Sequence, residues 1–170
     1  RQEVYALDGT EKEIHPYTVA EQNFTIQHLQ PRAHNRHAVF FTHARQALTY
    51  HYERDPADPR VQHALMLEVD SYGNVLKEAA IGYGRRQPDP NLPLQADRDK
   101  QTRTLITYTE NQVTNPIDDF NLHPNDYRTP LPAEAQTFEL TGYEGTGPVG
   151  RYRLEDLIQP DPAKSGNWLH

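Results

Sequence analysis

Residues 61–83 read VQHALMLEVDSYGNVLKEAAIGY, and this stretch decides the fold class. Apolar and polar residues alternate on both sides of residues 71–74, which is the pattern of a half-buried β-strand. The residues on one face are Val61, His63, Leu65, Leu67 and Val69 before the turn, and Val75, Lys77, Ala79, Ile81 and Tyr83 after it. Because Gly and Asn tolerate the positive φ of tight turns, Gly73-Asn74 joins the two runs into a predicted β-hairpin.

The same period of two recurs on both sides of this hairpin. Residues 24–29, 48–53, 104–108 and 136–140 alternate in the same way, and Thr and Tyr suit such exposed pleats. The pattern predicts six to eight strands in a mainly β fold, arranged as an antiparallel sheet or a sandwich-like segment.

Long proline-rich loops and short helices are expected between the strands. Residues 85–94 carry three prolines and residues 115–132 carry four, which makes both segments poor strands. Residues 95–102 are charged and free of Pro and Gly, so a short surface helix is predicted there. Residues 153–157 predict one further helical turn.

The apolar content is low for a globular domain. Leu, Ile, Val and Phe make up 34 of the 170 residues, which is close to the range of disordered chains. Ten tyrosines compensate in part, because each buries a ring and keeps its hydroxyl hydrated. We therefore expect a thin sheet, some of whose apolar surface is completed by a neighbouring segment.

Charge and cysteine content exclude several classes of function. Seventeen basic and 24 acidic residues give a net charge of −7, which argues against nucleic-acid binding. The absence of Cys excludes a disulfide scaffold and a thiolate nucleophile. Apolar runs are far shorter than the ~20 residues that a membrane span needs, so no direct membrane insertion is expected.

The chain is expected to consist of one β-rich domain between two flanks. The expected parts are an N-terminal flank at 1–15, the domain at 16–141, and a Gly- and Pro-rich flank at 142–170. Charge is interpreted as evenly spread, with no internal domain boundary. The absence of an initiating Met suggests a piece of something longer.

Histidines are the first candidates for a functional site. His34 and His37 have HxxH spacing, and His43 and His51 follow. A catalytic zinc site needs three ligands and a second shell to orient them. The HxxH stretch lies in a polar segment before a strand, so the pattern favours a loop with hydrogen-bonding histidines over a metal hydrolase.

Acidic residues offer weaker candidates. Glu11 and Glu13 form the ExE pair that ADP-ribosyltransferases use, but no matching strand precedes them, which favours a solvated turn. Asp118, Asp119 and Asp126 could offer oxygen ligands to calcium, yet they lack the offsets of an EF-hand. The residues 23–25 fit a glycosylation sequon inside a predicted strand.

Tyrosines on the strands leave one further alternative open. Tyr50, Tyr52, Tyr83 and Tyr108 could form a sugar-binding face, since aromatic rings stack on sugars. Such a face needs two or three coplanar rings on one exposed surface. The competing interpretation is that the rings fill a lean core.

Several longer strings resemble the B component of bacterial insecticidal toxin complexes, the Tc toxin B subunit of the TcaC and TcdB type. They are residues 30–40 (QPRAHNRHAVF), 50–60 (YHYERDPADPR), 73–77 (GNVLK), 83–86 (YGRR), 104–111 (TLITYTEN) and 126–132 (DYRTPLP). The resemblance runs in order from about residue 16 to residue 157. The part that they resemble lies in the middle-to-carboxyl region of that subunit, and residues 70–75 resemble a YD/Rhs-type hairpin.

The resemblance implies a structural role in a secreted toxin. Such subunits are similar to a hollow β-sheet shell that, with the C component, encloses a toxic effector. The implied partners are the rest of the B subunit, the C component with its effector and, indirectly, the A-component channel. No catalytic residue, cofactor-binding residue, metal ligand or cofactor is expected. An independent β-sandwich that binds carbohydrate or protein is the alternative.

Overall fold

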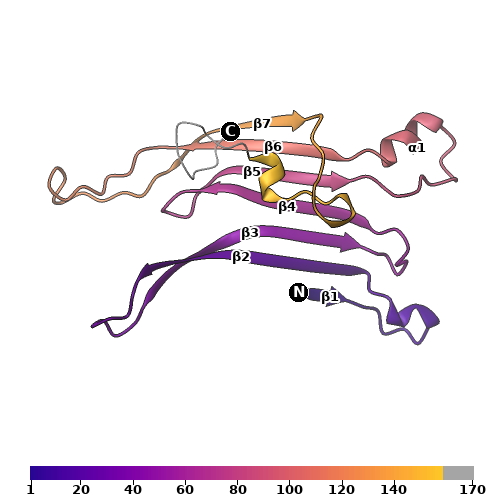
Figure 1. The fold of residues 1–170 in the computed structure, drawn as a ribbon, viewed down its shortest axis with the longest axis horizontal. Helices are drawn as coiled ribbons and strands as arrows, with labels where there is room; N and C mark the ends of the chain where they lie inside the picture. The colour runs from indigo at the N-terminus through magenta and orange to yellow at the C-terminus, as the bar shows by residue number, and fades with distance from the viewer. Residues whose placement is uncertain (159–170) are drawn as a thin grey trace. The chain divides into compact units, whose positions relative to one another are not determined.

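The computed structural model describes residues 1–158, which form a mainly β fold (Figure 1). Seven strands make one antiparallel sheet, in which the order of the strands is their order along the chain. The strands are β1 (Gln2–Val4), β2 (Thr18–Gln30), β3 (Val39–His51), β4 (Arg60–Val69), β5 (Val75–Tyr83), β6 (Leu105–Val113) and β7 (Pro132–Leu140). The predicted antiparallel, mainly β class is therefore confirmed.

Helical structure is limited to short segments. The α-helices of the described residues are α1 (Gln95–Gln101) and α2 (Leu154–Leu157), and the 3-10 turns are η1 (Glu11–Ile14) and η2 (Pro148–Gly150). Both α-helices lie where the sequence predicted them. Within residues 1–158, no helix combines the length and the apolar character that crossing a membrane requires.

The chain divides into two compact units, each made of two stretches of sequence. Unit one comprises Arg1–Leu65 and Ala80–Ile106, and unit two comprises Met66–Ala79 and the residues from Thr107 on. β1 and η1 fall within the predicted N-terminal flank. Of the predicted C-terminal flank, residues 159–170 lie outside the described residues.

The core of unit one is formed by alternate residues of neighbouring strands. In the antiparallel register Tyr50 lies opposite Val61, and Leu48 lies opposite His63. The buried residues of this unit are Val19, Val61, His63, Leu65, Ile81 and Ile106. The face predicted from residues 61–65 is thus the buried one.

One buried polar side chain in unit one has its hydrogen bonds satisfied. His63 Nδ1 lies 2.9 Å from the Tyr83 hydroxyl, and His63 Nε2 lies 3.2 Å from Gln46 Oε1. Because an amide oxygen only accepts, a single tautomer fits both contacts: Nε2–H donates to Gln46 and Nδ1 accepts from Tyr83. These hydrogen bonds offset the desolvation cost of placing a polar residue in the core.

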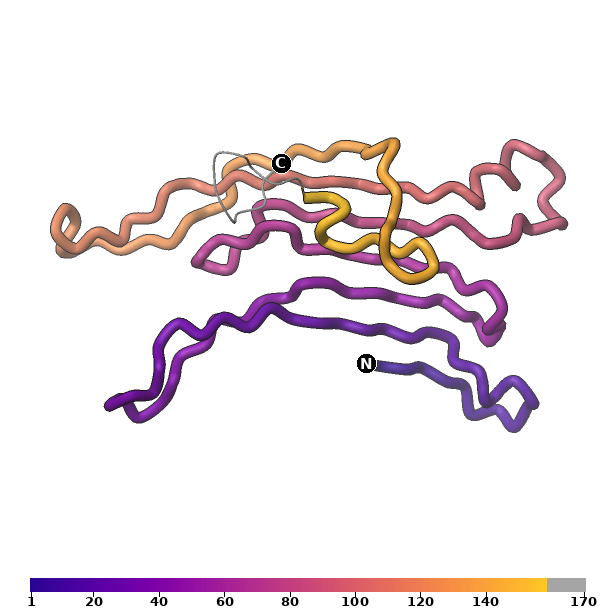
Figure 2. Tube along the Cα trace, viewed as in Figure 1, coloured from indigo at the N-terminus to yellow at the C-terminus, as the bar shows by residue number. Residues whose placement is uncertain are grey.

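β2 and β3 form a long hairpin in unit one (Figure 2). β1 pairs with β2 only from Thr18 to Ala20. Among residues 1–158, the remainder of β2 pairs with β3 alone. Two β-bulges interrupt the register, one between Asn23 and Phe24 and one between His28 and Gln30. We call residues 24–44, from the first bulge through the turn and back, the arm.

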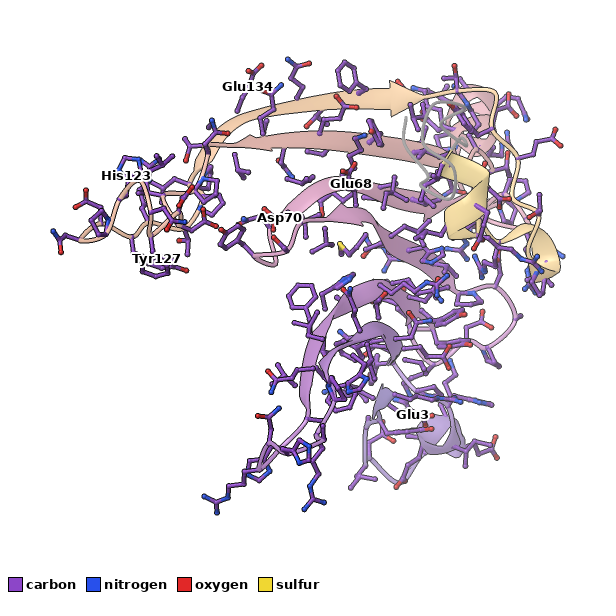
Figure 3. All side chains as sticks on the ribbon, turned by 60° about the vertical axis from the view of Figure 1, so that its left-hand side comes forward. Glu3, Glu68, Asp70, His123, Tyr127 and Glu134 are labelled. Atoms are coloured by element: carbon purple, nitrogen blue, oxygen red, sulfur yellow. The ribbon has the colours of Figure 1, made fainter. Side chains whose placement is uncertain are left out.

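Asp70 holds together the turn between β4 and β5 in unit two (Figure 3). Its carboxylate accepts hydrogen bonds from the backbone N–H groups of Tyr72 (2.9 Å) and Asn74 (2.8 Å) and from Asn74 Nδ2 (2.8 Å). Burial alone would raise the pKa of Asp70, but these bonds outweigh it and lower the pKa. Gly73 has φ +89°, so the predicted role of Gly in this hairpin is confirmed.

The described part of the C-terminal segment packs into unit two. The buried residues of this unit are Leu67, Ala79, Tyr108, Pro130, Tyr152, Leu157 and Ile158. Asp156 accepts hydrogen bonds from the Thr146 hydroxyl (2.6 Å) and the Arg153 backbone N–H (2.8 Å). The Tyr152 hydroxyl donates to the Tyr143 carbonyl at 2.6 Å. These bonds hold in place the segment that contributes Tyr152, Leu157 and Ile158 to the core of the unit.

Candidate interaction surfaces

The candidate histidines are not brought together into a metal-binding group. His34 and His37 are exposed in the turn between β2 and β3, while His43 and His51 lie on β3. Among residues 1–158 no three His, Asp or Glu side chains form a group that could hold a metal ion. The HxxH pair therefore lies in a loop, which is the position that the sequence favoured.

The acidic candidates take part in local turns. Glu13 lies in η1, and its Oε2 accepts a hydrogen bond from the Gly9 N–H at 2.9 Å. Asp119 Oδ1 accepts from the Asn121 N–H at 2.9 Å. These carboxylates satisfy backbone donors, which is a structural use of the charge.

The proline-rich segment between β6 and β7 is an extended hairpin of unit two. Ile117 and Arg128 pair through two backbone hydrogen bonds of 2.8 Å, and His123 and Tyr127 lie in its loop (Figure 3). The Tyr72 hydroxyl donates to Asp118, which raises the pKa of Tyr72 to about 12. This hydrogen bond therefore links the loop to the β4–β5 turn.

The tyrosines do not provide the exposed coplanar rings that the sugar-binding alternative needs. Tyr50 and Tyr52 stack with ring centroids 6.0 Å apart, but both are half-buried. Tyr83 stacks on His63, with ring centroids 6.1 Å apart. Tyr108 is buried in unit two, and burial raises the pKa of its hydroxyl. The structure favours the competing interpretation, in which tyrosine rings complete a lean core.

An ion pair holds the loop before η1 against the loop after β3 in unit one. Arg54 Nη1 lies 2.7 Å from Asp8 Oδ2, and its side chain also bonds Thr10. The hydrogen bond from Arg54 is the main reason that the pKa of Asp8 falls to about 2. The guanidinium carbon of Arg54 also lies 5.6 Å from the ring centroid of Tyr17, a cation–π distance.

Within the part of the chain that the structure describes, each unit has an open pocket. The pocket of unit one has a volume of about 380 Å³ and includes Arg60 and Arg85 in its lining. Arg60 pairs with Glu53, and Arg85 Nε lies 3.1 Å from Asp58 Oδ2, so the charges of both arginines are compensated. The pocket of unit two has about 440 Å³ and lies where β6 ends and β7 begins.

β7 is an exposed strand at the edge of the sheet. It is the last strand in the sheet order, so within residues 1–158 one side of its backbone has no partner strand. Every residue of β7 except Leu140 is exposed, and the side chains project from it as sticks in Figure 3. Contacts to β6 include the rings of Phe138 and Tyr108, whose centroids are 6.4 Å apart.

The chain belongs to the family described as the insecticide toxin TcdB middle/C-terminal region, whose family model matches residues 1–123. This confirms the resemblance to the Tc toxin B subunit. No curated protein matches the chain.

Solved Tc toxin structures contain the same fold. The crystal structure of TcdB2–TccC3 matches with a TM-score of 0.64 and 24% identity, and that of TcdB2–TccC3–Cdc42 with 0.63 and 26%; each match covers 79% of this chain and 7% of that one. The Tc holotoxin pore of Photorhabdus luminescens matches with a TM-score of 0.61 and 24% identity, over 80% of this chain and 6% of that one. The chain thus spans a small part of the proteins that it resembles.

Proposed function

We propose that the chain is a non-catalytic segment of the β-sheet shell of a secreted Tc toxin B subunit. In this role it helps to enclose a toxic effector together with the C component, and it meets the A-component channel only indirectly. The β-rich part at residues 16–141, between two flanks, would be the portion built into the shell.

The open edge of β7 carries this proposal. An edge strand with unpaired backbone groups invites pairing with other chains, and natural proteins blunt or cover such edges. β7 has nine residues, and its neighbour in the sheet lies on one side only. A further strip of the same shell would cover the other side and satisfy these groups.

The exposed apolar side chains support the same role. Large apolar side chains are exposed in both units, among them Phe24 and Ile26 in unit one and Phe120 and Phe138 in unit two. Large exposed apolar surface is typical of interaction sites. The neighbour in the solved structures is named as a complex of TcdB2 with TccC3, which supports a C component as partner.

Hydrogen exchange of the backbone amides tests the proposal. The chain is mixed with the remaining part of its B subunit and the C component, and exchange is followed by mass spectrometry. We expect the amides of β7 to slow by at least about tenfold, because new interstrand hydrogen bonds protect them. The loop at residues 119–126 serves as the internal control and keeps its rate.

A pair of variants makes this test specific. Phe138→Lys places a charge on the open strand and should abolish the added protection, while Phe120→Lys places the same charge in the exposed loop and should leave it intact. The melting temperatures of both free variants are measured first. Unchanged exchange in β7 of the wild-type chain after mixing would overturn the shell proposal.

A further inference from the structure

The arm belongs to a stretch of sequence with an unusual charge. Between Glu21 and Glu53 the chain has three arginines and five histidines but no aspartate, glutamate or lysine, although it holds 24 acidic residues in all. The interpretation that charge is evenly spread was therefore wrong. The signal was present in the sequence as a gap of 31 residues between carboxylates.

The edge of β2 is open along the arm. β1 stops at Ala20, so among the described residues no strand pairs with the outer side of β2 beyond that point. Between the two bulges, residues 24–28 keep a regular register with β3. Five regular residues are close to the usual length of a strand, so this edge has room for one added strand.

One face of the arm is apolar and exposed. Phe24 lies opposite Ala44, Ile26 opposite Thr42 and His28 opposite Phe40, and residues directly opposite one another share a face. Phe24, Ile26 and Phe40 are 54%, 68% and 57% exposed. The rings of His28 and Phe40 stack with centroids 4.9 Å apart, which extends the flat surface.

The tip of the arm is basic. Residues 31–38 read PRAHNRHA, and both arginines and both histidines of this segment are exposed. An apolar face with cationic groups beyond one end matches a partner with the opposite pattern, namely apolar side chains followed by carboxylates.

We infer that the arm is a docking element for an acidic β-strand of another protein, which adds to the edge of β2 at residues 24–28. Apolar side chains of that strand cover Phe24 and Ile26, and its carboxylates face Arg32 and Arg36. A polar tip with the apolar face behind it suits a protein surface better than insertion into a lipid bilayer, where the tip would enter first. The inference deepens the proposed shell role by giving the chemistry of one partner.

A peptide-binding assay with the full chain tests the inference. The probe is a capped, dye-labelled peptide in which a stretch with valine at alternate positions is followed by a run of glutamates, and binding is followed by fluorescence anisotropy. We expect saturable binding that weakens as salt is raised. Peptides in which serine replaces valine, or lysine replaces glutamate, should bind at least about tenfold more weakly, because each lacks one half of the complementarity.

Charge-matched variants locate the site. Arg32→Glu with Arg36→Glu should weaken binding of the glutamate–valine peptide by at least about tenfold. Lys100→Glu with Arg103→Glu makes the same change in net charge at exposed positions outside the arm and should change the affinity by less than about twofold.

Apolar variants test the exposed face. Ile26→Thr with Phe40→Thr keeps a strand-forming residue at each position and should weaken binding by a similar factor, whereas Leu94→Thr, at an exposed position outside the arm, should not. Far-ultraviolet circular dichroism of every variant confirms that the sheet is retained.

Three results would overturn the inference. Equal losses of affinity in the arm variants and in the control variants would mean that the peptide responds only to the overall charge of the chain. Equal binding of the serine peptide would mean that the apolar face has no role. Binding to vesicles of phosphatidylcholine and phosphatidylserine, with none to the peptide, would assign the arm to a lipid surface. None of these results bears on exchange in β7, so the shell proposal fails or stands separately.

Discussion

Replacing Leu65 by alanine tests how far this thin sheet depends on a few buried side chains. Leu65 lies on β4 in the core of unit one and is 0% exposed. The substitution removes three carbon atoms from a site without access to water. At ~0.8 kcal/mol for each buried carbon group, with a further contribution from the cavity, the expected loss is about 3 kcal/mol.

Urea denaturation followed by circular dichroism measures this loss. A change of about 3 kcal/mol in the free energy of unfolding corresponds to a fall of roughly 6–12 °C in melting temperature for a chain of this size. Leu7→Ala is the matched control, because Leu7 is 89% exposed and its truncation should cost less than about 0.5 kcal/mol.

Equal effects of the two leucine substitutions would refute the reasoning. They would mean that the alternation along β4 does not define the buried face and that the core lies elsewhere. A loss confined to Leu65→Ala supports a sheet in which the few buried residues on alternate positions carry most of the stability.

Three further predictions concern single side chains. Gly84→Ala should destabilise the chain by more than about 2 kcal/mol in urea titrations, because the new Cβ would lie 2.1 Å from a backbone carbonyl oxygen, while Gly82→Ala meets no atom within 4 Å and should cost little. Asp70→Ala should cost about 1–2 kcal/mol by the same assay, since it leaves turn N–H groups without their acceptor. For Asp8, the pKa is lowered to about 2 in the folded chain from an unfolded value near ~3.9, so its stabilising contribution is complete above about pH 4 and is lost as the pH falls towards 2. The difference in melting temperature between wild type and Asp8→Asn should therefore shrink from pH 7 to pH 3, and a constant difference would contradict the role of its pairing with Arg54.

The candidate sites show where reading a sequence for reactive groups falls short. The HxxH spacing drew attention to His34 and His37 as ligands, whereas the structure places them in the basic tip of the arm, beyond its exposed apolar face. Spacing describes neighbours along the chain only. What these histidines can bind depends on which residues lie near them in the hairpin, and the register of the two strands determines those neighbours.

The sequence predicted only part of the arm, because two bulges break the alternation of apolar and polar residues along its strands. β3 has one extra residue, Arg45, at the first bulge, and β2 has one, Leu29, at the second. Each extra residue shifts the period of two by one, so counting along the chain assigns side chains beyond it to the wrong face. Only the observed pairing places Phe40 on the same face as Phe24 and Ile26.

Sequence alone determined the features that depend on near neighbours: the alternating faces of β4 and β5, the turn at Gly73, and the short helix at Gln95–Gln101. These features follow from side-chain direction, φ preference and helix propensity over a few residues. Tertiary structure decided the pairs that lie far apart in the chain, such as Arg54 with Asp8 and His63 with Tyr83. It also decided which edges of the sheet stay open, because an open edge is defined by the strand that is not beside it.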